Sequence, residues 1–237
     1  MEKLRLLFTE DGLWSQVLKG KSVVSEHYAG RDEWSPSGFV EERLTELLTK
    51  EYGEIMVFSA YNHFALVPEG FSEHDRGFDL LALNSDVDRE KEELMLSVNK
   101  KYGVQFYYSF PLDFYKLIKS RMPKASFNFS GDKFLNAIST RGGKEIHVNL
   151  YHNQCEFFAL ENRKVLLYNN LDLNSEVDFL YFVMFTLSKI GFGLKETYFF
   201  VYGETSQNQT FISELDKFAE HMKIIFDNLP KKHFILN

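Results

Sequence analysis

The sequence predicts an α/β protein made of two halves, each with three strands, a helix and a further strand in that order. Three observations support this prediction. Short runs rich in β-branched and aromatic residues are separated by turn residues, and two longer segments carry apolar residues on a 3.6-residue period. The same order of elements also occurs twice, and the interval from Gly20 to Ile55 equals the interval from Asn162 to Thr197.

In the first half, turn residues divide the chain into three short strands. Asp11-Gly12 is typical of a hairpin turn and Gly20 marks the next turn, so we expect strands at residues 3–8, 13–19 and 22–28. A helix is expected to begin at Ser35-Pro36 and to end before Gly53. A fourth strand is expected at residues 54–60.

The second half repeats this order from residue 144 onward. We expect strands at residues 146–151, 155–161 and 164–169, followed by a helix that Asn174-Ser175 caps and Gly191 ends. A strand at residues 196–202 comes next. We then expect an amphipathic helix at residues 211–222 and a last short strand at residues 233–236.

The segment between the two repeats extends the first half. Residues 92–100 and 104–110 are expected to be strands, and Pro111 is expected to begin a helix that ends at Arg121. A further helix is expected at residues 131–139. The glycine pair Gly142-Gly143 suits a linker, so we place the first half at residues 1–140 and the second at residues 141–237.

The composition is that of a globular chain, and it argues against nucleic acid as a ligand. The net charge is −7, with 27 lysines and arginines against 34 acidic residues, whereas a phosphate-backbone binder needs a basic surface. The longest apolar run, residues 179–187, is shorter than the ~20 residues that cross a membrane. A single cysteine, Cys155, and the lack of a signal-peptide pattern favour a cytoplasmic protein.

The sequence lacks the common catalytic and cofactor motifs. It contains no Walker loop, no dinucleotide-binding glycine pattern and no nucleophile elbow. The seven histidines form no pair at zinc-ligand spacing, and His147 and Asn149, which share a strand face, are too few to indicate a catalytic site. We therefore predict no catalytic residue and no metal site, and we expect the 24 phenylalanines and 12 tyrosines to pack in the core.

The order of elements carries a family resemblance over nearly the whole chain. Two copies of a three-stranded meander, each followed by a helix, a strand and a helix, resemble the duplicated ribonuclease-H-like halves of the superfamily of actin, sugar kinases and heat-shock chaperones. More narrowly, residues 146–169, 178–187 and 198–203 resemble an uncharacterised bacterial family with an actin-like ATPase fold. The resemblance implies an actin-like ATPase architecture with an internal duplication.

The superfamily resemblance also implies ATP and Mg²⁺ between the halves. Such a site needs an acidic residue at the end of the first strand of each half, glycines in the turns that approach phosphate, and a glycine pair for the adenosine. Asp11 and Gly12 meet this need in the first half, although a hairpin turn explains the same pair. The second half offers Asn149 and Asn153 in place of an aspartate and a glycine, and Gly203 is followed by Glu204.

Two hypotheses follow from these departures. The first is a non-catalytic binding or scaffold protein that keeps the actin-like fold without nucleotide chemistry, and whose partner is a protein or a small ligand. The alternative is a nucleotide-binding ATPase or kinase, in which Asp11, Asn149 and Gly203 would converge between the halves. ATP and Mg²⁺ are expected as cofactors only under this alternative. The candidate ligand-binding residues are Asp11, Gly12, Asn149, Asn153 and Gly203. The oligomeric state is left open.

Overall fold

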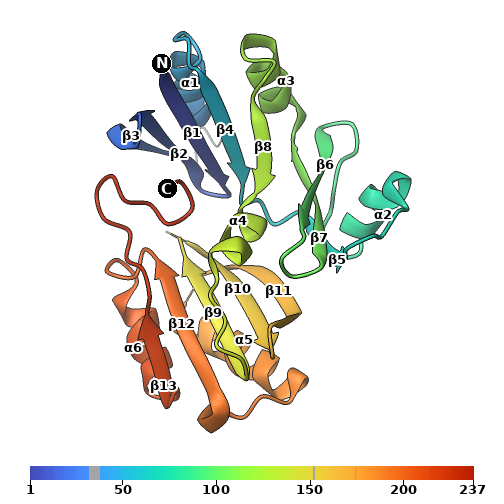
Figure 1. Ribbon diagram of the computed structural model, residues 1–237, viewed down its shortest axis with the longest axis vertical. Coiled ribbons are helices and arrows are strands. Elements are labelled where there is room, and N and C mark those ends of the chain that lie inside the picture. The colour runs from blue at the N-terminus through green and yellow to red at the C-terminus, as the bar shows by residue number, and fades with distance from the viewer. Residues whose placement is uncertain (32–37, 152, 174) are drawn as a thin grey trace. The chain divides into compact units, whose positions relative to one another are not determined.

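The computed structural model describes residues 1–31, 38–151, 153–173 and 175–237 of the chain (Figure 1). The helix start expected at Ser35-Pro36 lies outside the described residues. The chain divides into two compact units, each described by itself below. Unit 1 comprises Met1–Lys133 with Leu236, and unit 2 comprises Phe134–Ile235 with Asn237.

Unit 1 is built on a five-stranded sheet in the order β3-β2-β1-β4-β8. β1 pairs antiparallel with β2 and parallel with β4, which pairs parallel with β8. The apolar residues of α1 and α3 pack with β1 and β4 in one core. The bounds are β1 (Glu2–Thr9), β2 (Gly12–Lys19), β3 (Ser22–Gly30), α1 (Gly38–Leu47), β4 (Glu54–Ser59), α3 (Leu112–Arg121) and β8 (Ser126–Phe129).

A second, three-stranded antiparallel sheet completes unit 1. Its order is β5-β7-β6, and α2 packs against it through Leu81, which is buried with Ala65 and Tyr107. The bounds are β5 (Phe64–Pro68), the 3₁₀ turn η1 (His74–Arg76), α2 (Gly77–Leu81), β6 (Glu92–Asn99), β7 (Val104–Pro111) and the connecting helix α4 (Ser130–Ala137).

Unit 2 repeats the five-stranded arrangement in the order β11-β10-β9-β12-β13. Helix α5 begins at Ser175, whose hydroxyl accepts a hydrogen bond from the Asp178 backbone N–H, and ends at Gly191 with a left-handed φ of 72°. The bounds are β9 (Lys144–Leu150), β10 (Gln154–Glu161), β11 (Lys164–Asp172), α5 (Glu176–Ile190), η2 (Leu194–Glu196), β12 (Thr197–Gly203), α6 (Gln209–Asp216) and β13 (His221–Ile224).

The two sheets match in strand order, direction and irregularity, which confirms the predicted duplication. In both, the first strand pairs antiparallel with the second and parallel with the fourth. The register shifts at the same place in both second hairpins, between Val17 and Leu18 and between Ala159 and Leu160. A β-bulge at an equivalent position in each half is a shared structural detail that sequence identity did not reveal.

The structure corrects the predicted end of the chain. The helix expected at residues 211–222 ends at Asp216, and His221–Ile224 form a strand that pairs parallel with β12. The strand expected at residues 233–236 is not one, because the tail turns at Lys231, with φ 63°, and makes only an isolated bridge between Leu229 and Lys232. The short elements β5, β8 and α2 were not predicted.

The sheet of unit 2 is buried on both faces, and the two faces differ in chemistry. Apolar side chains, including Val148, Phe157 and the buried thiol Cys155, pack with α5 on one face. The other face carries polar side chains and an aromatic cluster around Phe134, whose ring centroid lies 5.4 Å from that of Phe158 and 5.2 Å from that of Tyr202. The largest fully buried side chains are all phenylalanine or tyrosine, which confirms the predicted aromatic core.

Candidate functional site

A buried carboxylate, Glu156, organises the polar face of the unit 2 sheet. It lies on β10 opposite Asn149 of β9 and is fully buried. Asn149 Nδ2 donates to Glu156 Oε2 at 2.8 Å, and Tyr151 Oη donates to the same oxygen at 2.7 Å. Tyr168 Oη donates to Glu156 Oε1 at 3.0 Å. Asn149 is therefore held by a protein carboxylate near the end of β9, at the position where the resemblance implies an acidic residue.

His147, two residues before Asn149, belongs to a second buried hydrogen-bond chain. Its Nε2 lies 3.2 Å from Glu145 Oε2, and its Nδ1 lies 3.1 Å from Tyr202 Oη. Burial lowers the pKa of His147 despite the neighbouring carboxylate, so the imidazole is neutral. Its ring stacks on Phe200 with centroids 4.8 Å apart. His147 shares the face with Asn149, as predicted, and acts there as a packed, hydrogen-bonded core residue.

Gly203 and Glu204 follow β12, beside the end of β9. Gly203 has φ 86°, and a methyl group there would lie 2.2 Å from Leu150 O and 2.5 Å from Asn149 Oδ1. The Glu204 backbone N–H donates to Leu150 O at 2.8 Å, so the turn is fixed against β9. The close approach of two strand ends explains why glycine is needed at position 203.

The Glu204 side chain is buried almost completely at this turn. Only 2% of the residue is exposed, and neither carboxyl oxygen has a hydrogen-bond partner among the described residues. Asn149 Oδ1 is likewise buried without a donor among them. Burial raises the pKa of Glu204 to about 7, because a carboxylate loses its hydration there. The end of this sheet therefore carries oxygen acceptors and a group that becomes negative near neutral pH.

The hairpin of unit 1 places Asp11 and Gly12 in a tight strand connection. A methyl group at Gly12 would lie 2.3 Å from Ala29 O, because Gly12 pairs with Gly30 across β2 and β3. The Asp11 backbone oxygen accepts hydrogen bonds from the Arg31 backbone N–H at 2.6 Å and from Tyr28 Oη at 3.1 Å. Strand packing thus accounts for the glycine without any ligand.

The five candidate residues divide between the units. Asp11 and Gly12 adjoin each other in unit 1, whereas Asn149, Asn153 and Gly203 belong to unit 2. Asn149 and Gly203 are brought into contact there, and Asn153 uses its backbone oxygen to accept a hydrogen bond from the Leu173 N–H at 2.7 Å. Within the described residues, no three His, Cys, Asp or Glu side chains lie where they could hold a metal ion.

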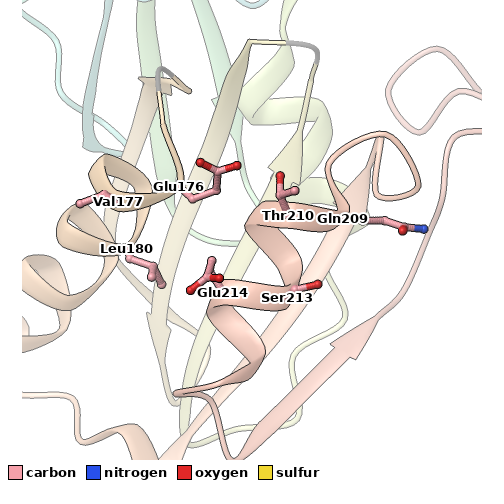
Figure 2. Close-up of a pocket in the computed structure, with 7 residues that line it drawn as sticks. All are labelled: Glu176, Val177, Leu180, Gln209, Thr210, Ser213 and Glu214. Carbon is pink, nitrogen blue, oxygen red and sulfur yellow. The ribbon is translucent and has the colours of Figure 1, made fainter.

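A surface groove lies between α5 and α6 of unit 2. Figure 2 shows Glu176 and Leu180 of α5 and Glu214 of α6 pointing into the space between the two helices. The groove has a volume of about 600 Å³. Its lining contains two carboxylates and no lysine or arginine: Glu176, Val177, Leu180, Gln209, Thr210, Ser213 and Glu214.

An apolar stripe on α5 continues from this groove. Val177, Tyr181 and Phe185 are spaced four residues apart, on one face of the helix, and are 75%, 69% and 47% exposed. The rings of Tyr181 and Phe185 stack with centroids 6.0 Å apart. Val177 belongs to both the groove and the stripe, so the two form one continuous surface, named here the α5 face.

Comparison with known proteins places the chain in a family. The profile described as protein of unknown function (DUF3822) matches residues 3–222. The chain belongs to the DUF3822 family. No curated protein matches the sequence. Among the described residues, no helix is both long enough and apolar enough to cross a membrane.

Solved structures show the fold of this DUF3822 chain. A Bacteroides thetaiotaomicron VPI-5482 protein with an actin-like ATPase fold and unknown function matches with TM-score 0.82 and 18% identity, over 98% of this chain and 92% of that one. A chain of the PilM–PilN type IV pilus biogenesis complex matches with TM-score 0.53 and 11% identity, over 96% and 91%. The ethanolamine utilization protein EutJ from Carboxydothermus hydrogenoformans matches with TM-score 0.51 and 8% identity, over 100% and 89%. These likenesses confirm the predicted actin-like architecture.

The residues of unit 2 do not fit ATP and Mg²⁺. The implied Mg²⁺ position is taken by Asn149, whose amide is bonded to Glu156, and the implied second adenosine glycine is taken by Glu204. Glu156 is fully buried and accepts hydrogen bonds from Asn149, Tyr151 and Tyr168, so it is not available to a Mg²⁺ ion, and Glu204 adds a buried carboxyl group where glycine is implied. Sequence analysis found Asn149 and Gly203 but not Glu156 or Tyr168, because no motif marks residues that meet only through strand pairing.

Proposed function

We propose that this protein is a non-catalytic, partner-binding member of the actin-like fold that does not use ATP. The observation that carries the proposal is Glu204, a buried carboxyl group without a hydrogen-bond partner among the described residues, at the position where the resemblance implies a second glycine. Its side chain follows Gly203, where the resemblance implies adenosine, and above neutral pH it would bring an ionised carboxylate there. The buried single thiol of Cys155 also fits a cytoplasmic protein, which we include in the proposal.

Calorimetric titration with ATP, in the presence and absence of Mg²⁺, tests the first part of this proposal. We expect no heat of binding at protein concentrations that detect micromolar affinity. Thermal unfolding of the same sample serves as the control that the protein is folded. Saturable, Mg²⁺-dependent binding would contradict the proposal and favour an ATPase or kinase.

We further propose that the α5 face is where the partner binds. A stripe of three exposed apolar side chains beside a groove is typical of a surface that receives a helix. Glu176 makes no ion pair among the described residues, whereas Glu214 pairs with Lys217, so Glu176 is the carboxylate that favours a positively charged partner. The occupant is thus a basic amphipathic helix of another protein. A chain of the PilM–PilN complex has the same fold, which supports a role in an assembly.

A matched pair of helix-forming peptides tests the α5 face. A peptide of about 15 residues with leucine on one face and lysine on the other is long enough to form a helix when bound. We expect it to bind, and we expect the double substitution Tyr181→Ser and Phe185→Ser to weaken binding at least about tenfold, or about 1.4 kcal/mol. Fluorescence anisotropy measures the affinity.

The controls distinguish specific binding at the α5 face from nonspecific hydrophobic binding. Leu83→Ser removes another exposed apolar side chain, on unit 1, and should leave the affinity unchanged. The same peptide with glutamate in place of lysine should bind at least about tenfold more weakly. Equal binding of the two peptides, or an equal effect of Leu83→Ser, would reject the α5 face as the docking site.

A further inference from the structure

A small cavity in unit 1 gathers charged and polar side chains from five segments of the chain. Its volume is about 280 Å³, near the lower limit for small-molecule sites. Residues from the hairpin after β1, the end of β3, the segment after β4, the start of β6 and β7 surround it. The lining is Glu10, Arg31, Tyr61, His63, Lys91, Glu92, Ser109 and Pro111.

Arg31 contributes a guanidinium group that pairs with no carboxylate among the described residues. Its Nη2 donates to Tyr61 Oη at 3.0 Å, and its guanidinium carbon lies 5.5 Å from the Tyr61 ring centroid. Burial raises the pKa of Tyr61, so the phenol stays protonated and supplies no counter-charge. Arg31 Nε is buried without an acceptor, and Arg31 makes no ion pair within the described part of the chain. An uncompensated, partly buried guanidinium is costly unless an anion joins it.

His63 faces the same cavity from a fixed orientation. Its Nδ1 lies 2.9 Å from Glu92 Oε2, and Ser109 Oγ donates to the same oxygen. Because Nδ1 is engaged, Nε2 is the ring nitrogen left for a ligand. The hydrogen bond to Glu92 raises the pKa of His63 against the effect of burial, and Glu10 and Asp86 add to the rise. Protonation of His63 would therefore place a second positive charge beside Arg31.

The other charged side chains of the cavity limit the negative charge that a ligand can carry. Glu92 is hydrogen-bonded to His63 and Ser109. Glu10 accepts a hydrogen bond from the Asn62 N–H at 2.9 Å. Lys91 forms an ion pair with Asp88 at 3.0 Å on the rim. Two nearby carboxylates repel a dianion more strongly than a monoanion.

A planar guanidinium matches a planar carboxylate through two parallel hydrogen bonds. Tyr61 and Pro111 offer apolar surface for a short carbon skeleton.

We propose that this cavity binds a small organic carboxylate, with the carboxylate group on Arg31 and the carbon skeleton against Tyr61 and Pro111. Protonated His63 adds a second donor to the ligand through Nε2. Binding is thus tighter at pH 6 than at pH 8, where His63 is more often neutral. The site is independent of the α5 face, since the cavity and the α5 face belong to different units.

Acetate titration followed by nuclear magnetic resonance tests this proposal. The readout is the backbone amide shifts of Tyr61 and Ser109, at an ionic strength held constant with chloride. We expect a saturable response to acetate, at least about tenfold weaker in Arg31→Gln, since the lost contact is charge-assisted. Arg76→Gln is the matched control, because Arg76 is an exposed arginine of the same unit that pairs with Glu73. It should bind acetate like the unsubstituted protein.

A second variant keeps the test independent of the folding of Arg31→Gln. His63→Gln retains Arg31 and should still bind acetate, but with equal affinity at pH 6 and pH 8. A linear, non-saturating response of the unsubstituted protein would overturn the proposal, as would equal binding by Arg31→Gln and Arg76→Gln. Tighter binding of inorganic phosphate than of acetate would also overturn it, since the site would then prefer a different oxyanion.

Discussion

Replacing Glu156 with alanine is expected to lower the free energy of unfolding by about 4 kcal/mol. Three buried donors, on Asn149, Tyr151 and Tyr168, would lose their acceptor, and each unsatisfied buried donor costs about 1–3 kcal/mol. The space left by the side chain adds to the loss. Urea unfolding followed by circular dichroism measures the difference.

Two comparisons show whether the hydrogen-bond network is responsible. Glu161→Ala, at the partly exposed end of the same strand, should change stability by less than about 1 kcal/mol. The pair Glu156→Ala and Tyr168→Phe should be clearly non-additive, because the two side chains share one hydrogen bond. Additive effects of these two substitutions would show that the network does not act as a unit.

Replacing Glu204 with glutamine is expected to stabilise the protein by about 3 kcal/mol at pH 8 and by little at pH 5. The folded-state pKa of Glu204 is raised from 4.5 to about 7, so between these values the unfolded state binds fewer protons than the folded state. Stability due to this group is therefore present at low pH and is lost as pH rises to about 7. A shift of this size corresponds to about 3 kcal/mol. Glutamine resembles the protonated acid and removes the titration.

Chemical denaturation at pH 5, 6, 7 and 8 measures this effect. The unsubstituted protein should lose stability relative to Glu204→Gln as the pH increases, with most of the change between pH 5 and pH 7. Glu220→Gln is the control, since Glu220 is half exposed and only weakly paired with Lys195 at 3.9 Å. Parallel pH profiles for the unsubstituted protein and Glu204→Gln would contradict the prediction.

Elements with local signals were predicted well from the sequence. Ser175 and Gly191 mark the two ends of α5 through capping chemistry that depends only on neighbouring residues. Gly20 and Asn162 both have positive φ at the turns where they were expected. The duplication was likewise visible, because the spacing of these turns from the fourth strand is the same in both halves.

Elements held by distant contacts were not predicted. β8 and β13 have four residues each and exist because β4 and β12 offer parallel edges to pair with. Their own sequences carry too little periodicity to distinguish a strand from a helix end. For the same reason, residues 217–222 were predicted to continue the helix, although α6 ends at Asp216.

The candidate site was predicted only in part. The positions of Asn149 and Gly203 followed from strand ends, which sequence locates well. Tyr168 reaches Glu156 across β10 and β11, whose register includes a bulge at Ala159 and Leu160 that no local signal announces. Glu204 has no hydrogen-bond donor near it among the described residues, and only a three-dimensional structure can show this.

The burial of Cys155 has a practical consequence for experiments on this protein. Its thiol is the only one in the chain, it is fully buried, and burial raises its pKa, so little reactive thiolate forms. Maleimide reagents should therefore leave the unsubstituted protein unmodified under native conditions. A cysteine introduced at an exposed position such as Leu83 or Val177 can be labelled selectively, without first removing the natural one. A single dye or spin label can therefore be attached to either unit of the native chain through one introduced cysteine.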